Sequence, residues 1–135
     1  MQIVDIKDIK TPLYVHSVQA GFPSPADDYI EKQLDFNDLL VSHPAATFCV
    51  KASGDSMIGA GIFPGDILVV DKSLKAANNS IVIAINNGEF TVKRLVIQNG
   101  KFFLMPENPA YNVIAIDSEG FEIWGVVTYV LHKAR

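Results

Sequence analysis

From residue 47 onward the chain is a series of short β-prone runs separated by turn-forming residues, and this spacing constrains the fold more than any other feature. The expected strands cover residues 47–53, 67–71, 80–86, 89–97, 101–106, 112–116 and 121–131. Turn chemistry stands between them at Pro64-Gly65, Asn78-Asn79, Asn86-Asn87-Gly88, Asn99-Gly100 and Glu119-Gly120. Because many short strands follow one another at close spacing, the sequence predicts a mostly β protein with a compact, curled sheet body.

The first 46 residues predict a different organisation. Residues 1–20 lack a long helical stripe, although Ile3, Ile6 and Ile9 indicate one short turn, and residues 13–19 are β-prone. Residues 21–25 hold a glycine and two prolines, which exclude regular structure there. We therefore predict a flexible N-terminal arm of residues 1–24 before a domain of residues 25–135.

Two short helices are expected where the domain begins. The first covers residues 25–34, because Ser24 can act as its cap, Pro25 suits its first turn and Asp27 completes a capping-box pattern. The second runs from Asp35, as cap, to Val41, and is ended by the following residues 43–44.

Composition excludes several classes of protein. A net charge of −4 and a pI near 5.2 argue against a nucleic-acid groove, so no direct sequence-specific DNA binding is expected. No apolar run is long enough to span a membrane, and no secretion signal is evident at the N-terminus. The single cysteine, Cys49, is expected to be a buried, inert thiol. These features predict a cytoplasmic protein without membrane association, and no motif indicates a metal site or a cofactor.

Ser56 stands in a turn that could expose a nucleophile. Residues 47–52 deliver the chain to Gly54, which permits a sharp turn, and Ser56 follows two residues later. A serine nucleophile needs an accessible hydroxyl with amide donors beside it to hold a developing oxyanion. The alternative is an ordinary polar turn between two strands, since turns use serine routinely.

A serine nucleophile also needs a base, and Lys93 is the candidate. The three histidines (His16, His43 and His132) have no convincing placement, and no motif offers an aspartate to orient one of them. Strand alternation places Lys93 on the face of Thr91, Leu95 and Ile97, where lost hydration would lower the pKa of its amine. The alternative is a lysine that extends into solvent at a strand edge.

Three segments together resemble the LexA/UmuD family of self-cleaving peptidases of the Ser-Lys type. They are residues 51–57 (KASGDSM), 65–71 (GDILVVD) and 88–95 (GEFTVKRL), and the similarity continues in residues 105–111 and 125–127. The resemblance implies a sheet body of the LexA/UmuD C-terminal type, with Ser56 as nucleophile and Lys93 as general base. It also implies that the backbone N–H groups of Asp55 and Ser56 form the oxyanion hole, and it gives the Asp55 side chain no role.

The same family cuts its own chain between a small residue and a glycine. Here Ala20-Gly21 stands at the irregular joint, so the resemblance implies self-cleavage of this bond. A small Ala20 side chain fits a tight pocket, Gly21 lets the backbone approach closely, and Val18 would fill a second, apolar pocket.

The short arm is similar to UmuD-like members rather than to LexA-type repressors, because 20 residues cannot form a helix-turn-helix domain. This implies a homodimer in the SOS response, cleaved under stimulation by RecA–single-stranded-DNA filaments. The shortened product would be an accessory subunit of an error-prone Y-family (UmuC-like) translesion DNA polymerase. The dimer surface could include residues 36–40 or 124–131, although both are also plausible core.

Three other interpretations stay open at this point. The body could be chiefly a binding module, in which cleavage only releases a surface. It could be a phage or plasmid regulator that associates with LexA-like repressors. A signal-peptidase relative also uses serine and lysine, but the expected absence of a membrane anchor disfavours it.

Overall fold

A computed structural model of the chain describes residues 2–4, 10–14, 30–116 and 121–135, with side chains from residue 34 onward. The chain divides into two compact units, one formed by Met1–Asp5 with His43–Arg135 and the other by Ile6–Ser42. The predicted division into an arm of residues 1–24 and a domain of residues 25–135 stays a prediction, because residues 15–29 lie outside the described part.

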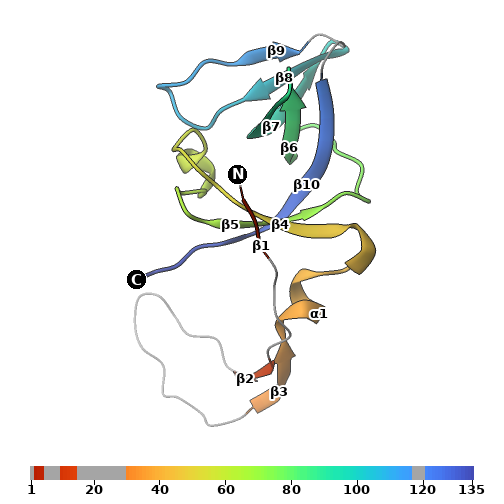
Figure 1. Ribbon diagram of the computed structural model, residues 1–135, viewed down its shortest axis with the longest axis vertical. Coiled ribbons are helices and arrows are strands. Elements are labelled where there is room, and N and C mark those ends of the chain that lie inside the picture. The colour runs from red at the N-terminus through yellow and green to blue at the C-terminus, as the bar shows by residue number, and fades with distance from the viewer. Residues whose placement is uncertain (1, 5–9, 15–29, 117–120) are drawn as a thin grey trace. The chain divides into compact units, whose positions relative to one another are not determined.

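The larger unit is built on one antiparallel sheet of eight strands in the order β1-β4-β5-β10-β6-β7-β8-β9 (Figure 1). Its strands are β1 (Gln2–Val4), β4 (Thr47–Lys51), β5 (Ile67–Asp71), β6 (Ile81–Asn86), β7 (Glu89–Gln98), β8 (Lys101–Met105), β9 (Ile114–Ile116) and β10 (Phe121–Leu131). Two 3-10 turns, η1 (Pro44–Ala46) and η2 (Ile58–Ala60), flank β4 and the segment that follows it. The mostly β prediction is confirmed, and all seven strands expected after residue 47 form with small differences at their ends.

The longest strand, β10, joins the two parts of the sheet. Its second half pairs with β5 and its first half with β6, and the register shifts between Ile123 and Gly125 and again between Val127 and Tyr129. Such irregularities bend a strand and increase its twist. At Gly125 a Cβ atom would lie only 2.5 Å from Cγ1 of Val70, so this close approach requires glycine. The curled shape expected from the sequence therefore depends on β10.

The core consists of two clusters on opposite faces of the sheet. One contains Met57 with Val50, Ile83 and their neighbours, and the other contains Val82 with Leu95 and others. Because Val82 and Ile83 are consecutive on β6, their side chains point to opposite faces. The first cluster buries Met57 to 1% exposure, which anchors the chain immediately after Ser56.

The smaller unit contains a two-stranded sheet and one short helix. Strand β2 (Lys10–Tyr14) pairs antiparallel with β3 (Ile30–Asp35), and α1 (Phe36–Leu40) follows directly. Asp35 caps this helix by accepting a hydrogen bond from the Asn37 N–H at 2.9 Å, which confirms the second expected helix.

Two local predictions for the N-terminal region are wrong. The helix expected over residues 25–34 does not form at 30–34, since these residues pair with β2, and residues 25–29 lie outside the described part. Pairing with a distant strand outweighs the local capping signal. Ile3, expected in a short turn, instead lies in β1 and pairs with Val50 of β4.

Candidate active site

The Ser56 turn is held at both ends by the sheet. Before it, Ala52 continues the pairing of β4, donating to the Asp66 carbonyl at 2.8 Å and accepting from the Gly65 N–H at 2.9 Å. Gly54 then adopts φ +77°, a left-handed conformation that favours glycine. After the turn, Met57 is buried in the core. The half-buried Ser56 is therefore presented from a short segment with two fixed ends.

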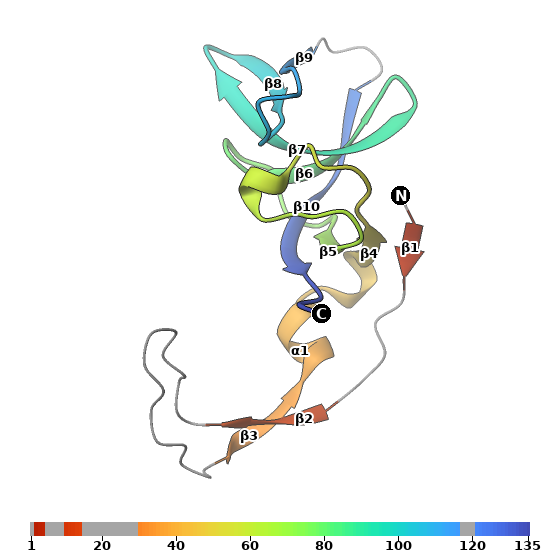
Figure 2. The same ribbon diagram turned by 90° about the vertical axis from the view of Figure 1, so that its left-hand side faces the viewer.

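Lys93 lies on β7, which has neighbours on both sides in the sheet. Figure 2 shows the segment that follows β4, drawn in yellow to yellow-green, passing alongside this strand. Lys93 Nζ lies 3.0 Å from Ser56 Oγ, and the residue is only 9% exposed. The structure thus brings together the two side chains that the sequence paired, and the alternative of a solvent-exposed lysine does not hold.

Two further groups surround the amine. Nζ lies 2.7 Å from Thr91 Oγ1 and 3.1 Å from the Val92 carbonyl oxygen. Desolvation by burial lowers the pKa of Lys93 below its ordinary value of 10.5, and the described residues place no carboxylate in contact with the amine to oppose this. For Thr91, strand alternation predicts only that its side chain shares the face of Lys93.

The hydrogen-bond partners of Nζ are compatible with both the protonated and the neutral amine. A protonated amine has three donors, whereas a neutral one has two donors and one lone pair. The Val92 carbonyl can only accept, but the hydroxyl groups of Ser56 and Thr91 can accept or donate. The site can therefore hold Lys93 in either state, and in the neutral state the lone pair can accept the proton of Ser56.

The backbone N–H groups of Asp55 and Ser56 are available as donors. Neither of them donates a hydrogen bond to any acceptor in the part of the chain that the structure describes. Two adjacent amide donors beside a serine hydroxyl are the arrangement that stabilises an oxyanion in acyl transfer.

A loop after β8 contacts the Ser56 turn at several points, although the sequence predicts no functional role for any single residue of this loop. The Glu107 N–H donates to the Ser56 carbonyl at 2.8 Å, and the Glu107 carbonyl accepts from the Gly59 N–H at 2.8 Å. Asn108 Nδ2 donates to the Asp55 carbonyl at 2.9 Å, and the Tyr111 hydroxyl donates to Asp55 Oδ1. This last bond raises the pKa of Tyr111. The available signal was the resemblance in residues 105–111, which does not identify contacts.

The described histidines pair with aspartates and not with Ser56. His43 Nδ1 lies 2.6 Å from Asp71 Oδ2, and His132 Nδ1 lies 2.6 Å from Asp66 Oδ1. Ser73 bonds to the Asp71 carboxylate rather than to a histidine ring, so these groups do not form a catalytic triad. His16 lies outside the described residues.

The expected cleavage site also lies outside the described residues. Val18, Ala20 and Gly21 fall within residues 15–29, so their placement relative to Ser56 stays a prediction.

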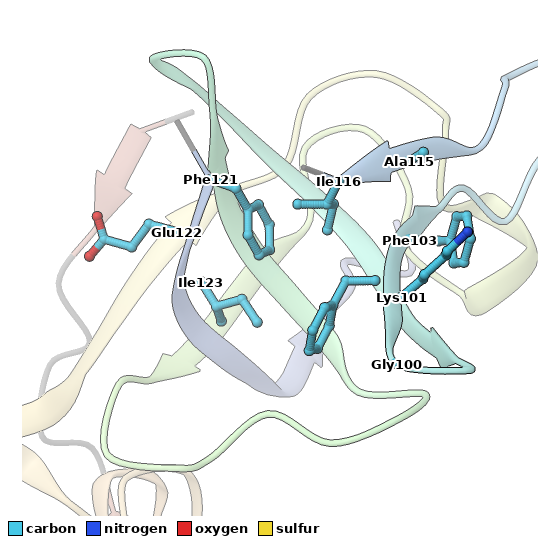
Figure 3. Close-up of a pocket in the computed structure, with 9 residues that line it drawn as sticks. Gly100, Lys101, Phe103, Ala115, Ile116, Phe121, Glu122 and Ile123 are labelled. Atoms are coloured by element: carbon cyan, nitrogen blue, oxygen red, sulfur yellow. The ribbon is translucent and has the colours of Figure 1, made fainter. Parts of the chain in front are cut away.

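A separate hollow of about 710 Å³ lies between β8, β9 and the start of β10. Figure 3 shows Phe121, Ile116 and Ile123 facing it, while Glu122 points away. Among the described residues, its lining includes neither Ser56 nor Lys93. Among the described residues, no group of three or more His, Cys, Asp or Glu side chains could hold a metal ion. No helix in the described ranges is long and apolar enough to cross a membrane.

Comparison of the sequence with known proteins identifies the family of this chain. Residues 12–128 match the family described as Peptidase S24-like. The chain is 49% identical to Protein SamA of Salmonella typhimurium, over 92% of this chain and 86% of SamA. It is 47% identical to Protein MucA of Escherichia coli, over 89% of this chain and 83% of MucA. It is also 35% identical to the LexA repressor of Clostridium perfringens, over 87% of this chain and 60% of the repressor. The chain therefore belongs to the Peptidase S24-like family, the LexA/UmuD group of self-cleaving serine peptidases.

Proposed function

We propose that this chain cuts its own Ala20–Gly21 bond, with Ser56 as nucleophile and Lys93 as general base. The observation that carries the proposal is the 3.0 Å separation between Ser56 Oγ and the buried amine of Lys93. A buried lysine is a competent base because desolvation lowers its pKa and increases the neutral fraction near physiological pH.

The reaction follows from the groups around Nζ. The neutral amine accepts the Ser56 proton while Oγ attacks the Ala20 carbonyl carbon and forms a tetrahedral intermediate. The resulting ammonium then gives the proton to the Gly21 nitrogen as the C–N bond breaks, which leaves Ala20 as an ester on Ser56. Water, deprotonated by Lys93, hydrolyses this ester and restores the serine.

The remaining groups fit this chemistry. The N–H groups of Asp55 and Ser56 would bind the oxyanion of the tetrahedral intermediate. A hydroxyl at Thr91, 2.7 Å from Nζ, and the Val92 carbonyl hold the amine in place while its lone pair faces Ser56. On the substrate side, the small Ala20 and the apolar Val18 would fill two adjacent pockets, as expected for an extended strand.

The test is incubation of the purified full chain over a range of pH, followed by mass spectrometry. We expect a fragment that begins at Gly21, formed at a rate that rises through the pKa of Lys93. Ser56→Ala and Lys93→Met should abolish the fragment, whereas Lys101→Met, a matched change at an exposed lysine, should not. An intact wild-type chain at alkaline pH, or cleavage that survives Ser56→Ala, would contradict the proposal.

We also propose that this cleavage serves an SOS-associated, UmuD-like role. The similarity to SamA and MucA over most of each chain supports this context. In the cytoplasm, a RecA–single-stranded-DNA filament would raise the population of chains whose cleavage segment is docked, without contributing a catalytic group. The product would act as a homodimer with a UmuC-like, Y-family polymerase.

The partner proposal has its own test. Mass spectrometry with and without an activated RecA filament should show faster formation of the Gly21 fragment with the filament. If a chain beginning at Gly21 and carrying Ser56→Ala supports mutagenesis, the product acts by binding and the Ser-Lys pair serves only maturation. An unchanged cleavage rate with the filament would contradict the proposed stimulation.

A further inference from the structure

The loop of residues 106–111 fixes the two peptide groups on either side of the Ser56 Cα atom. On the N-terminal side, the Asp55 carbonyl accepts from Asn108 Nδ2 at 2.9 Å. On the C-terminal side, the Ser56 carbonyl accepts from the Glu107 N–H at 2.8 Å. These donors are consecutive residues of one loop, and the Asp55 carbonyl accepts one further, longer hydrogen bond from the Ile58 N–H of the turn itself, at 3.4 Å.

The first of these bonds has a geometric consequence for the Ser56 N–H. The Asp55 carbonyl and the Ser56 N–H belong to the same peptide group, which is planar and trans, so they point in opposite directions. A donor that fixes the direction of the carbonyl therefore also fixes the direction of the N–H. A hydrogen bond accepted at the carbonyl also polarises the amide, which makes its N–H a stronger donor.

We propose that Asn108 is a positioning residue of the peptidase reaction, which aims the Ser56 N–H at the developing oxyanion through the Asp55 carbonyl. This inference rests on the proposed function. The Asn108 side chain makes no hydrogen bond to the side chains of Ser56 or Lys93 within the described residues, and acts through the peptide group to which it donates.

The amide of Asn108 is itself held in one orientation. Its Oδ1 accepts a hydrogen bond from the Ala110 N–H at 3.0 Å, while its Nδ2 donates to the Asp55 carbonyl. Because an N–H can only donate and a carbonyl can only accept, rotating the amide by 180° would lose both bonds. Asn108 therefore combines a donor and an acceptor at fixed places, and neither aspartate nor alanine can replace it fully.

The loop is in turn attached to the strand that carries the base. Arg94, next to Lys93 on β7, donates from Nε to Glu107 Oε1 at 2.6 Å and from Nη1 to the Asn79 carbonyl at 2.7 Å. Tyr111 adds a further bond, from its hydroxyl to the Asp55 carboxylate. The position of Asn108 is thus set relative to the same strand that positions the amine.

The experiment compares Asn108→Asp and Asn108→Ala with the wild-type full chain. Asn108→Asp preserves the shape of the side chain and the acceptor for Ala110, but replaces the donor to Asp55 by an oxygen. Asn112→Asp is the matched control, because Asn112 is exposed and its side chain makes no hydrogen bond within the described residues. Two quantities are measured for each chain, namely the nitrogen-15 resonance of the Ser56 amide and the self-cleavage rate over a range of pH.

We expect both Asn108 variants to shift the Ser56 amide resonance and to lower the plateau of the cleavage rate by about 10- to 100-fold, as a misdirected oxyanion donor should. The midpoint of the pH profile should stay at the wild-type value in Asn108→Ala, since Lys93 is unchanged. If a variant instead loses its cleavage rate because it unfolds, the dispersed amide resonances of the folded chain will be lost as well. Asn112→Asp should leave both quantities at their wild-type values.

The outcomes separate this inference from the proposed function. If the Ser56 resonance does not move in either Asn108 variant, or if it moves while cleavage stays at the wild-type rate, the positioning role is wrong. A wild-type chain that never forms the Gly21 fragment contradicts the proposed function, and with it the proposed effect of Asn108 on the cleavage rate. In that case the amide resonance alone still decides whether Asn108 orients the peptide.

Discussion

Replacing Gly59 by alanine should displace the loop that holds the Ser56 turn. A Cβ atom at this position would lie 2.6 Å from the Glu107 carbonyl oxygen, whereas ordinary contact begins at 3.4 Å, so the two segments must separate by about 0.8 Å. Gly59 has no left-handed φ, so alanine adds no backbone strain of that kind. The substitution therefore tests the displacement by itself.

The expected effect on cleavage follows from this distance. The Glu107 N–H donates to the Ser56 carbonyl at 2.8 Å. A shift of about 0.8 Å along that bond would lengthen it to about 3.6 Å, where a hydrogen bond no longer exists. A misplacement of about 1 Å at a reacting group can reduce a rate about 100-fold. We expect Gly59→Ala to lower the self-cleavage rate about 10- to 100-fold, with a destabilisation of only about 1–3 kcal/mol from the added contact.

The assay is the rate of formation of the Gly21 fragment, measured together with urea unfolding of the same preparations. Gly61→Ala is the control, because Gly61 has φ +81° and open space around its missing Cβ. It should lose about 1–2 kcal/mol of stability through backbone strain without moving Glu107. The reasoning is refuted if folded Gly59→Ala cuts at the wild-type rate, or if Gly61→Ala loses as much activity as Gly59→Ala.

The remaining predictions concern stability. Burial lowers the pKa of Lys93, so the buried ammonium reduces the free energy of unfolding. This reduction is largest at pH values below the lowered pKa and disappears as the pH approaches 10.5. Urea unfolding should therefore show the wild type gaining stability relative to Lys93→Met as the pH rises, and parallel curves would contradict this. The hydrogen bond from the Ser73 side chain is the main cause that lowers the pKa of Asp71. The ionised carboxylate therefore stabilises the fold in full above pH 3.8, and this stabilisation is lost as the pH falls through the lowered pKa. The free energy of unfolding of Asp71→Asn should accordingly fall less steeply than that of the wild type as the pH is lowered below 3.8. The same slope in both proteins would contradict this prediction. Gly125→Ala, whose Cβ would lie 2.5 Å from Val70 Cγ1, should lose about 1–3 kcal/mol in thermal unfolding, and a wild-type melting temperature would show that the strand relaxes freely.

The strands and the Ser-Lys pair could be predicted because their signals are local or come from whole motifs. Short β-prone runs between turn residues identified the strands from β4 to β10, including the Asn87-Gly88 hairpin, where both residues have positive φ. The alternation along β7 predicted that Lys93 shares a face with Thr91, and Nζ does contact the Thr91 hydroxyl.

The misses have one physical cause, which is contact between segments distant in sequence. Residues 30–34 carry a helix-like pattern, but they pair with β2, and no local signal reports a partner that lies 16 to 23 positions away in the sequence. The contacts of Asn108 with Asp55 likewise join residues more than 50 positions apart. A motif can mark such a loop as part of a family without indicating which atoms it holds.

The two neighbouring residues of β7 show why stability alone is a poor guide to this site. Arg94 and Glu107 keep 26% and 31% of their side chains exposed, and an ion pair so accessible to water contributes at most about 1 kcal/mol to folding. Lys93 lowers stability in its charged form, because its amine is desolvated. Lys93 and Arg94 therefore stabilise the fold little or destabilise it. Lys93 nevertheless holds its amine 3.0 Å from Ser56 Oγ, and Arg94 binds Glu107 of the loop that contacts the Ser56 backbone. The contribution of Lys93 and Arg94 to the site lies in the distances that they maintain, and a cleavage rate or a local spectroscopic signal reports these distances more directly than stability does.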